Sequence, residues 1–318
     1  MNSENQYPKV SVILPTYNRA HTLEKSINSV LEQTYKNLEL IVIDDCSTDE
    51  TKKVISGITD ARLKYIFNKI NFGPSKSRNI GIETSTGELI AFQDSDDEWY
   101  PDKLEKQVKL LINSGDDVAG VYCGMEFYDL KSGNKIGEEL REMDFKASYT
   151  TGSFFYTPAN VTVLIKKSVL DEVGYFDNRL FADEDTELAI RVTKKYRYIF
   201  CGEILVKVNR NHDQLTGSAK YYTLAKEIIY EKHKNYLSKM ILFSLCKQIA
   251  NYYILTDNNH KALRYVKYAL QHKRNLITIA QFLLLLVVPP LLSFAYKRKY
   301  KYGLPHPNDP NKFLPHNI

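Results

Sequence analysis

The alternation of short apolar segments with helical segments in the N-terminal part of the chain most constrains its fold. Apolar runs at 9–15, 38–43, 63–67 and 89–92 have the length and the branched side chains of buried strands. Segments with helical spacing of apolar residues separate successive runs. Strands that alternate with helices of about ten residues predict βαβ units. We therefore expect an α/β domain with a mostly parallel sheet and helices on both of its faces.

Polar segments follow the predicted strands at the point where each strand ends. They read TYNR at 16–19, DDCSTD at 44–49, NFGPSKSRN at 71–79 and DSDDE at 94–98. In open parallel sheets, ligands bind beyond the carboxyl ends of the strands. The four segments therefore predict one site at one edge of the sheet.

The segment 94–98 holds four carboxylates in five residues, directly after an apolar strand. Their mutual repulsion favours a bound cation. Mg2+ and Mn2+ prefer oxygen ligands, and Mg2+ often binds through one or two carboxylates together with substrate phosphates. The alternative is a solvated acidic turn before the helix that begins near Pro101.

The charge of the chain is unevenly distributed. Residues 1–215 hold 27 Lys and Arg against 34 Asp and Glu, a net charge of −7, whereas residues 216–318 hold 16 against 4, a net charge of +12. A basic C-terminal third predicts an anionic partner, either lipid head groups or nucleic acid. Carboxylates in the predicted site would repel nucleic-acid phosphates, so we expect no nucleic-acid partner.

The cysteines and the N-terminus indicate the compartment. Cys46, Cys123, Cys201 and Cys246 are far apart and form no CxxC pair, which argues against a zinc site or a disulfide framework and favours a reducing compartment. The polar start MNSENQYPKV does not have the pattern of a signal peptide. We therefore expect the protein in the cytoplasm.

The C-terminal third has a different pattern. Helical segments are expected at 219–237, 239–255 and 258–272, and 276–295 is almost uncharged, with Pro289-Pro290 interrupting it. Lys and Arg flank this apolar segment on both sides, which favours a re-entrant or interfacial segment on the anionic cytoplasmic leaflet over a clean span. The alternative is a buried helix pair with a proline kink. The predicted organisation is an α/β domain with the predicted site at 1–215, a helical region at 216–275, a membrane-associated hydrophobic segment at 276–296 and a basic irregular tail at 297–318.

Five motifs in order resemble those of the inverting family 2 glycosyltransferases, of the type that builds bacterial surface and capsular polysaccharides. The resemblance covers about residues 8–215 and implies the GT-A fold. The motifs are VSVILPTYNR at 10–19, IVIDDCSTD at 41–49 (with Cys46 in place of the usual Gly), NFG at 71–73 with SRN at 77–79, DSDD at 94–97, and GYFD at 174–177 followed by DEDTEL at 183–188.

The resemblance implies a nucleotide site. Asp45 would accept a hydrogen bond from a uracil imide N–H, and Arg78 would reach the nucleotide near its diphosphate. Trp99 would line the sugar pocket or simply pack against the next helix. The implied nucleotide-binding residues are Pro15, Thr16, Tyr17, Asn18, Arg19, Asp45, Asn71, Arg78, Asp94 and Ser95.

The resemblance also implies a metal and a base. Mn2+ or Mg2+ would neutralise the leaving diphosphate. Asp96 is the expected main ligand, Asp97 and His212 are further candidates, and which of Asp94, Asp96 and Asp97 binds the metal directly stays open. Asp185 would be the general base and Glu184 would position the acceptor or the base. Helix capping is the alternative role for an acidic residue in 183–185.

The implied reaction is single-displacement transfer of a sugar from a nucleotide-sugar, expected to be a UDP-sugar. The acceptor would be a hydroxyl of a lipid-linked or polysaccharide molecule at the inner face of the cell membrane. Three alternatives stay open. They are a polyprenyl-phosphate sugar synthase with the same fold, a nucleotidyltransferase (disfavoured because the opening lacks a Gly-rich loop), and a non-catalytic protein that binds nucleotide-sugars or other anionic ligands.

Overall fold

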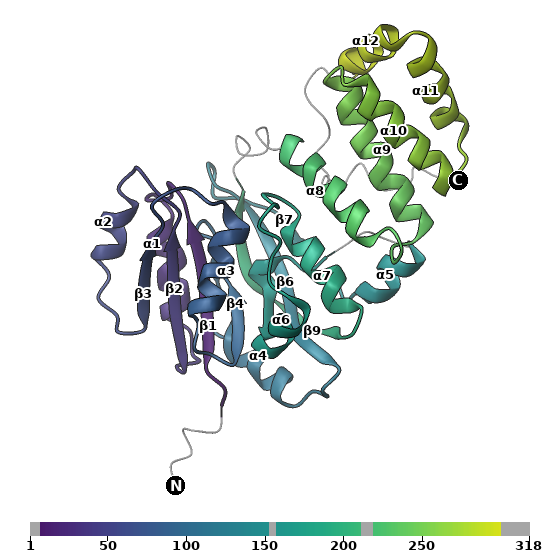
Figure 1. Cartoon of the computed structure of the whole chain (residues 1–318). Coiled ribbons are helices and arrows are strands. Elements are labelled where there is room, and N and C mark those ends of the chain that lie inside the picture. The colour runs from purple at the N-terminus through teal and green to yellow at the C-terminus, as the bar shows by residue number, and fades with distance from the viewer. Residues whose placement is uncertain (1–6, 153–156, 211–218, 300–318) are drawn as a thin grey trace. The chain divides into compact units, whose positions relative to one another are not determined.

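A computed structural model describes residues 7–152, 157–210 and 219–299. The chain divides into two compact units, Met1–Ser148 with Tyr156–Asn211 and Tyr149–Phe155 with His212–Ile318. In the described residues the first unit is a sheet flanked by helices, and the second unit is helical (Figure 1).

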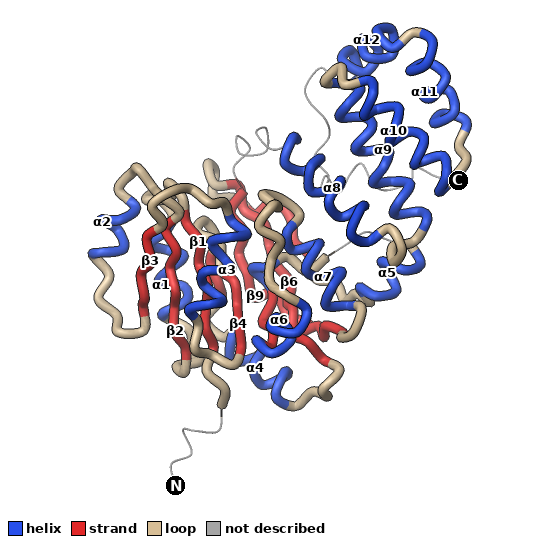
Figure 2. The backbone as a smooth tube through the Cα atoms, viewed as in Figure 1, coloured by secondary structure: helices blue, strands red, loops and turns tan. Residues whose placement is uncertain are grey.

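The first half of the sheet is parallel, as the alternation of segments predicts. Its strands lie in the order β3-β2-β1-β4 (Figure 2), and each is followed or preceded by a helix on the chain. The elements are β1 (Val10–Thr16), α1 (Leu23–Leu31), β2 (Leu38–Asp44), α2 (Thr51–Ser56), β3 (Leu63–Phe67), α3 (Pro74–Thr84) and β4 (Leu89–Phe92).

The second half of the sheet is mixed. Strand β8 lies antiparallel between β4 and β6, β6 pairs parallel with β9, and β5 pairs antiparallel with β9. The expectation of a mostly parallel sheet is therefore wrong for this half. The elements are β5 (Glu98–Trp99), α4 (Lys103–Ile112), β6 (Val118–Asp129), β7 (Lys135–Glu139), α5 (Phe145–Thr151), a 3-10 turn (Asn160–Thr162), β8 (Val163–Lys166), α6 (Lys167–Val173), α7 (Glu184–Thr193) and β9 (Arg197–Arg210).

Residues 130–150 are mostly polar in sequence, yet they contain the hairpin strand β7 and most of α5. Strand β7 pairs antiparallel with β6 across a turn that includes Gly133 at φ +70°. Its residues KIGEE are largely exposed, so an apolar alternation that would identify a strand is absent from this edge.

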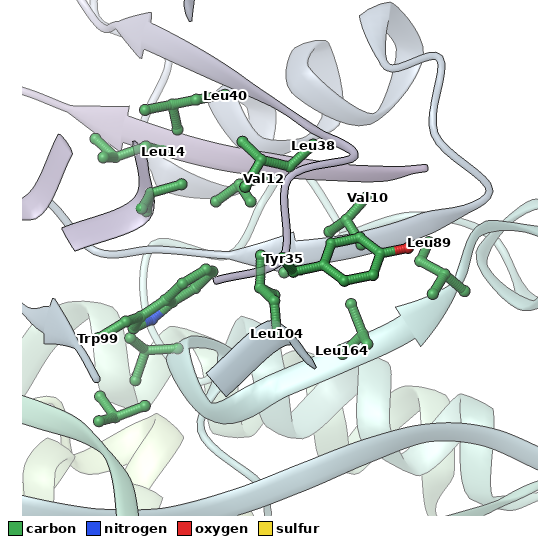
Figure 3. Close-up of a cluster of buried hydrophobic side chains, with 14 of the residues drawn as sticks. Val10, Val12, Leu14, Tyr35, Leu38, Leu40, Leu89, Trp99, Leu104 and Leu164 are labelled. Atoms are coloured by element: carbon green, nitrogen blue, oxygen red, sulfur yellow. The ribbon is translucent and has the colours of Figure 1, made fainter. Parts of the chain in front are cut away.

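Helices cover both faces of the sheet, and the apolar side chains of β1 point alternately to one face and to the other. Val12 and Leu14 pack in a hydrophobic core with side chains of α1 and α4. Figure 3 shows part of this core, including Leu104 of α4 and Trp99 of β5. Ile13 points to the opposite face, where α3 packs. A Cβ added at Gly81 of α3 would lie 2.5 Å from Cγ2 of Ile13, so this close helix–sheet contact requires glycine.

The second unit confirms the three predicted helices and the break at the proline pair. Side-chain caps explain several helix starts, because Ser238, Asn258 and Asn275 accept hydrogen bonds from backbone N–H groups of the first turns of α9, α10 and α11. The helices are α8 (Ala219–His233), α9 (Lys239–Leu255), α10 (Asn259–His272), α11 (Leu276–Val287) and α12 (Pro289–Lys299).

Residues 297–299, predicted to begin an irregular tail, instead form the last turn of α12. The rest of that predicted tail lies outside the described residues. Among the helices that the structure describes, none combines the length and the apolar character needed to cross a membrane.

Candidate active site

One open pocket lies beyond the carboxyl ends of β1, β2 and β4, where the sequence pattern predicts the site. It has a volume of about 270 Å³. Of the ten predicted nucleotide-binding residues, all except Asn18 line it, and Asp96 lines it as well. The lining residues are Pro15, Thr16, Tyr17, Arg19, Asp45, Asn71, Gly73, Pro74, Ser77, Arg78, Asp94, Ser95, Asp96 and Phe181.

Asn18 lies beside the pocket and joins two of its loops. Its backbone N–H donates to Ser47 Oγ at 2.9 Å, and its Oδ1 accepts from the Thr48 N–H at 2.8 Å. The left-handed backbone at Asn18, with φ +52°, suits asparagine better than most residues. Its side chain therefore fastens the loop after β1 to the loop after β2.

The buried carboxylate of Asp45 organises the loop before α3. Its Oδ1 accepts from Asn68 Nδ2 at 2.9 Å and from Phe72 N at 3.0 Å, and its Oδ2 accepts from Gly73 N at 2.7 Å. A carboxylate oxygen has room for a second donor, so Oδ2 retains capacity toward a ligand. Nearby, the buried Thr16 Oγ1 has no hydrogen-bond partner within the described chain. A polar ligand in the pocket would satisfy it.

Arg78 connects two loops that are far apart in the sequence. Its side chain is 5% exposed, its Nη1 donates to Glu184 Oε1 at 2.6 Å, and its Nη2 donates to Asp94 Oδ1 at 2.8 Å. Its Nε is buried and has no hydrogen-bond partner among the residues described. The guanidinium therefore holds the acidic loop after β4 and the start of α7 at one place, and it reaches the pocket itself.

The acidic loop sends its carboxylates in two directions. Asp94 and Asp96 line the pocket, where Arg19 Nε lies 3.6 Å from Asp96 Oδ2. Burial and the charge of Asp94 raise the pKa of Asp96. Asp97 is buried away from the pocket lining, and its Oδ1 accepts from the Asn209 N–H at 3.0 Å, which fastens the loop to β9.

The pocket chemistry suits a cation on the Asp94 and Asp96 side. Asp45, Asp94 and Asp96 outnumber Arg19 and Arg78, and a diphosphate would add further negative charge. Within the described ranges no group of three or more His, Cys, Asp or Glu could hold a metal ion, so a cation would also need ligands from elsewhere, such as substrate phosphates. The metal roles of Asp96 and Asp97 stay predictions, and His212 lies outside the described residues.

The predicted base lies at the N-terminus of α7. Asp183 precedes the helix with φ +54°, and Asp185 Oδ1 accepts from its neighbour Thr186 N at 2.7 Å. Burial, followed by the charges of Glu184 and Asp183, raises the pKa of Asp185 to about 8. Asp185 is not among the pocket-lining residues. The adjacent Glu184 accepts a hydrogen bond from Arg78, and Arg78 does line the pocket.

Sequence reasoning missed Phe181 as a pocket residue. Its ring lines the pocket and remains 44% exposed, and a Cβ added at Gly73 would lie 2.4 Å from Phe181 Cε1. The preceding carbonyl, of Leu180, accepts a hydrogen bond from Ser75 Oγ. Phe181 falls between the two halves of the last motif, so only the fold reveals its contact with Gly73.

Comparison with known proteins places these features in a family. The model of the family described as "Glycosyl transferase family 2" matches residues 11–174. A GalNAc(5)-diNAcBac-PP-undecaprenol beta-1,3-glucosyltransferase of Campylobacter jejuni is 32% identical over 284 residues, which cover 80% of this chain and 86% of that protein. The UDP-Glc:alpha-D-GlcNAc-diphosphoundecaprenol beta-1,3-glucosyltransferase WfgD of Escherichia coli is 43% identical over 105 residues, covering 33% of this chain and 42% of WfgD.

A solved structure shows the same fold. Residues 1–349 of S. aureus TarS, crystallised with UDP-GlcNAc, superpose with a TM-score of 0.63 at 16% identity, covering 92% of each chain. The sheet with its flanking helices is therefore of the GT-A type, as the motifs predict. On the family match and the C. jejuni relative, the chain belongs to glycosyl transferase family 2 and is a glycosyltransferase.

Proposed function

We propose that this glycosyltransferase moves a sugar from a UDP-sugar to a hydroxyl of a lipid-linked or polysaccharide acceptor, with inversion at the anomeric carbon. The observation that carries the proposal is the pair of hydrogen bonds from Arg78 to Asp94 and to Glu184. Direct displacement needs the leaving diphosphate and the base on opposite sides of one sugar. The buried Arg78 supports such an arrangement, because it keeps the pocket carboxylate and the base loop beside one another.

The polar lining of the pocket supports a nucleotide donor. Thr16 Oγ1 and Asp45 Oδ2 offer hydrogen-bonding capacity for a base and ribose, and Arg78 and Arg19 offer positive charge for phosphates. The name of the E. coli relative gives UDP-Glc as its donor, and TarS was crystallised with UDP-GlcNAc. Both favour uridine as the nucleoside here.

Asp185 is the proposed base. A carboxylate whose pKa is near 8 takes up a proton far more readily than an ordinary aspartate. It would remove the proton from the acceptor hydroxyl as that oxygen bonds to the anomeric carbon and the bond to the diphosphate breaks. Glu184, held by Arg78, would keep the base loop in place.

Mn2+ or Mg2+ is part of the proposal. Asp94 and Asp96 would hold the ion, and when bound it would neutralise the diphosphate as it leaves. Arg19, which lies close to Asp96, would orient the same carboxylate.

A hydroxyl acceptor is favoured over the alternative of a polyprenyl phosphate. A phosphate acceptor is already ionised and needs no strong base, whereas the raised pKa of Asp185 suits deprotonation of an alcohol. The C. jejuni relative is named for a substrate attached to undecaprenol diphosphate. A lipid-linked acceptor of that kind would bring this enzyme to the inner face of the cell membrane.

The test is release of nucleoside diphosphate from a panel of sugar nucleotides with Mn2+, with Mg2+ and with EDTA. We expect turnover of one or two UDP-sugars that requires the metal and is lost in Asp96→Ala and in Asp185→Asn. Asp171→Asn is the matched control, because Asp171 is a carboxylate on α6 bonded to Tyr175 and does not line the pocket. Absence of metal-dependent turnover or binding with every donor would refute the proposal.

A further inference from the structure

The α11–α12 hairpin of the second unit exposes most of its apolar side chains and buries polar ones beside Leu285 and Leu292. The side chains that it buries include Thr278, Gln281 and Ser293, which are 0%, 7% and 3% exposed. Gln281 Nε2 donates to Tyr296 Oη, and Ser293 Oγ donates to Asp257 Oδ1 at 2.5 Å. A helix adapted to water buries its apolar stripe and exposes its polar one. Here, polar contacts fasten the hairpin to the rest of its unit.

The outward face of the hairpin is apolar. Ten of its large apolar side chains are at least 36% exposed, and the two most exposed are Leu276 at 84% and Val287 at 76%. Scattered single exposures are ordinary, but a set of this size on one short hairpin marks an interaction surface. We call this set the apolar face: Leu276, Ile277, Ile279, Leu283, Leu284, Leu286, Val287, Val288, Leu291 and Phe294.

Basic residues predominate around the apolar face, and Asp257, which pairs with Lys297, is the acidic residue that contacts α12 among the described residues. Residues 258–299 contain no Asp or Glu. The basic residues lie at both ends of the hairpin, with Lys273 and Arg274 just before α11 and three more in the last turn of α12. The eight Lys and Arg of this range are Lys261, Arg264, Lys267, Lys273, Arg274, Lys297, Arg298 and Lys299.

The length of the hairpin helices favours a shallow position in a bilayer. At 1.5 Å per residue, the 12 residues of α11 extend about 18 Å, compared with about 30 Å for the hydrocarbon core. Pro289-Pro290 then starts a second helix, so the basic residues at the two ends of the hairpin can both stay at one surface. An amphipathic segment with basic flanks lies in the interface and is attracted to anionic lipids.

We propose that α11–α12 is a one-leaflet membrane anchor whose apolar face enters an anionic phospholipid surface. The occupant of the apolar face is the bilayer itself, because the eight Lys and Arg of 258–299 outnumber the one carboxylate paired with them, Asp257, and so complement anionic head groups. The inference deepens the proposed function by naming the surface that brings the enzyme to a lipid-linked acceptor. Binding to lipid can be measured without any donor or acceptor, so its test is independent of the transfer reaction.

The experiment is flotation of the full chain with vesicles of phosphatidylcholine alone or with a third of phosphatidylglycerol. We expect most of the protein to float with the anionic vesicles, and at least tenfold less with Leu283→Glu/Leu286→Glu. The matched control is Leu110→Glu/Ile112→Glu, because these exposed side chains on α4 lie in the first unit. Lys273→Glu/Arg274→Glu should reduce flotation several-fold and remove most of its salt dependence.

Three results would overturn the inference. The first is no flotation of the wild type, and the second is equal flotation of the wild type and the Leu283→Glu/Leu286→Glu variant. The third is a wild type that forms a concentration-dependent dimer in place of binding vesicles, where only the Leu283→Glu/Leu286→Glu variant abolishes the dimer. The last result would assign the apolar face to a second copy of the chain. Circular dichroism and UDP release in solution should match wild type in all variants. Flotation with anionic vesicles but no sugar transfer would refute the proposed function and leave the membrane anchor supported.

Discussion

The two units depart from an ordinary water-soluble protein in opposite ways. The first unit buries charges, because Arg78 is 5% exposed and Asp97 is 4% exposed. The second unit exposes apolar side chains on α11 and α12. Buried charges and large exposed apolar surfaces both cost stability, so each departure marks a surface kept for something other than folding. The first holds a pocket together, and the second offers a face to a partner.

The strongest test of the buried-charge site is Asp185→Asn. The amide keeps the shape of the side chain but cannot take the acceptor proton, so we expect kcat to fall by about 10²–10⁴-fold. The binding of UDP, measured by calorimetry, should stay within a few-fold of wild type because Asp185 does not line the pocket. Equal loss of UDP binding and of turnover would contradict the assignment as base.

Arg78→Met should have the next largest effect. It leaves the carboxylates of Asp94 and Glu184 without their partner, and hydrogen bonds to charged groups contribute about 1.5–3 kcal/mol each. We expect kcat/KM to fall about 10²-fold and the free energy of unfolding to fall by about 3 kcal/mol. The matched control is Arg62→Met, because the partly buried Arg62 pairs with Asp60 outside the pocket lining and should affect turnover little. Normal kcat/KM in Arg78→Met would remove the central support for the proposed function.

The pH dependence tests the raised pKa of Asp185. Only the ionised carboxylate can act as the base, so kcat/KM should rise about tenfold per pH unit at low pH and level off above about pH 8. Glu184→Gln removes one of the negative charges that raise this pKa, and it should move the inflection to lower pH. A profile that is flat from pH 6 to pH 9 would exclude Asp185 as a titrating base.

Phe181→Ala should have a smaller effect, mainly on donor binding. The ring lines the pocket and packs over Gly73, and its contact with the aromatic base of a bound nucleotide would contribute about 0.5–1.5 kcal/mol. We expect KM for the donor to rise about five-fold with little change in kcat. Phe67→Ala is the control, because Phe67 is similarly exposed and lies outside the pocket lining. An unchanged KM would show that the ring only covers the glycine.

The parallel half of the fold could be predicted from sequence because β1, β2 and β4 are buried apolar runs and the half-exposed β3 is still rich in apolar residues. Leu38–Asp44 is buried at every residue, and a run of this length with several β-branched side chains favours a strand over a helix. The mixed half could not be predicted from sequence, because β7 is an exposed edge strand and the direction of β8 depends on its neighbours β4 and β6. Pairing direction is set by tertiary contacts that periodicity does not record.

The candidate site divides in the same way. Local motifs predicted the pocket residues that follow strands, such as Thr16, Asp45 and Asp94. They did not predict that Arg78 joins Asp94 to Glu184, that Asp97 turns toward Asn209, or that Phe181 lies over Gly73. Each of the three contacts joins segments about a hundred residues apart, and only the closed fold brings such segments together.

The smallest expected change is that of Leu286→Ala in the second unit, and its comparison with Leu285→Ala separates the apolar face from the core beside it. Leu285 is 4% exposed, and the adjacent Leu286 is 54% exposed. Leu285→Ala should lower the free energy of unfolding by about 2–5 kcal/mol, whereas Leu286→Ala should change it by less than about 0.5 kcal/mol. Urea unfolding of both variants measures this directly. If both destabilise equally, Leu286 is covered in the folded chain, and the apolar face is not available to lipid.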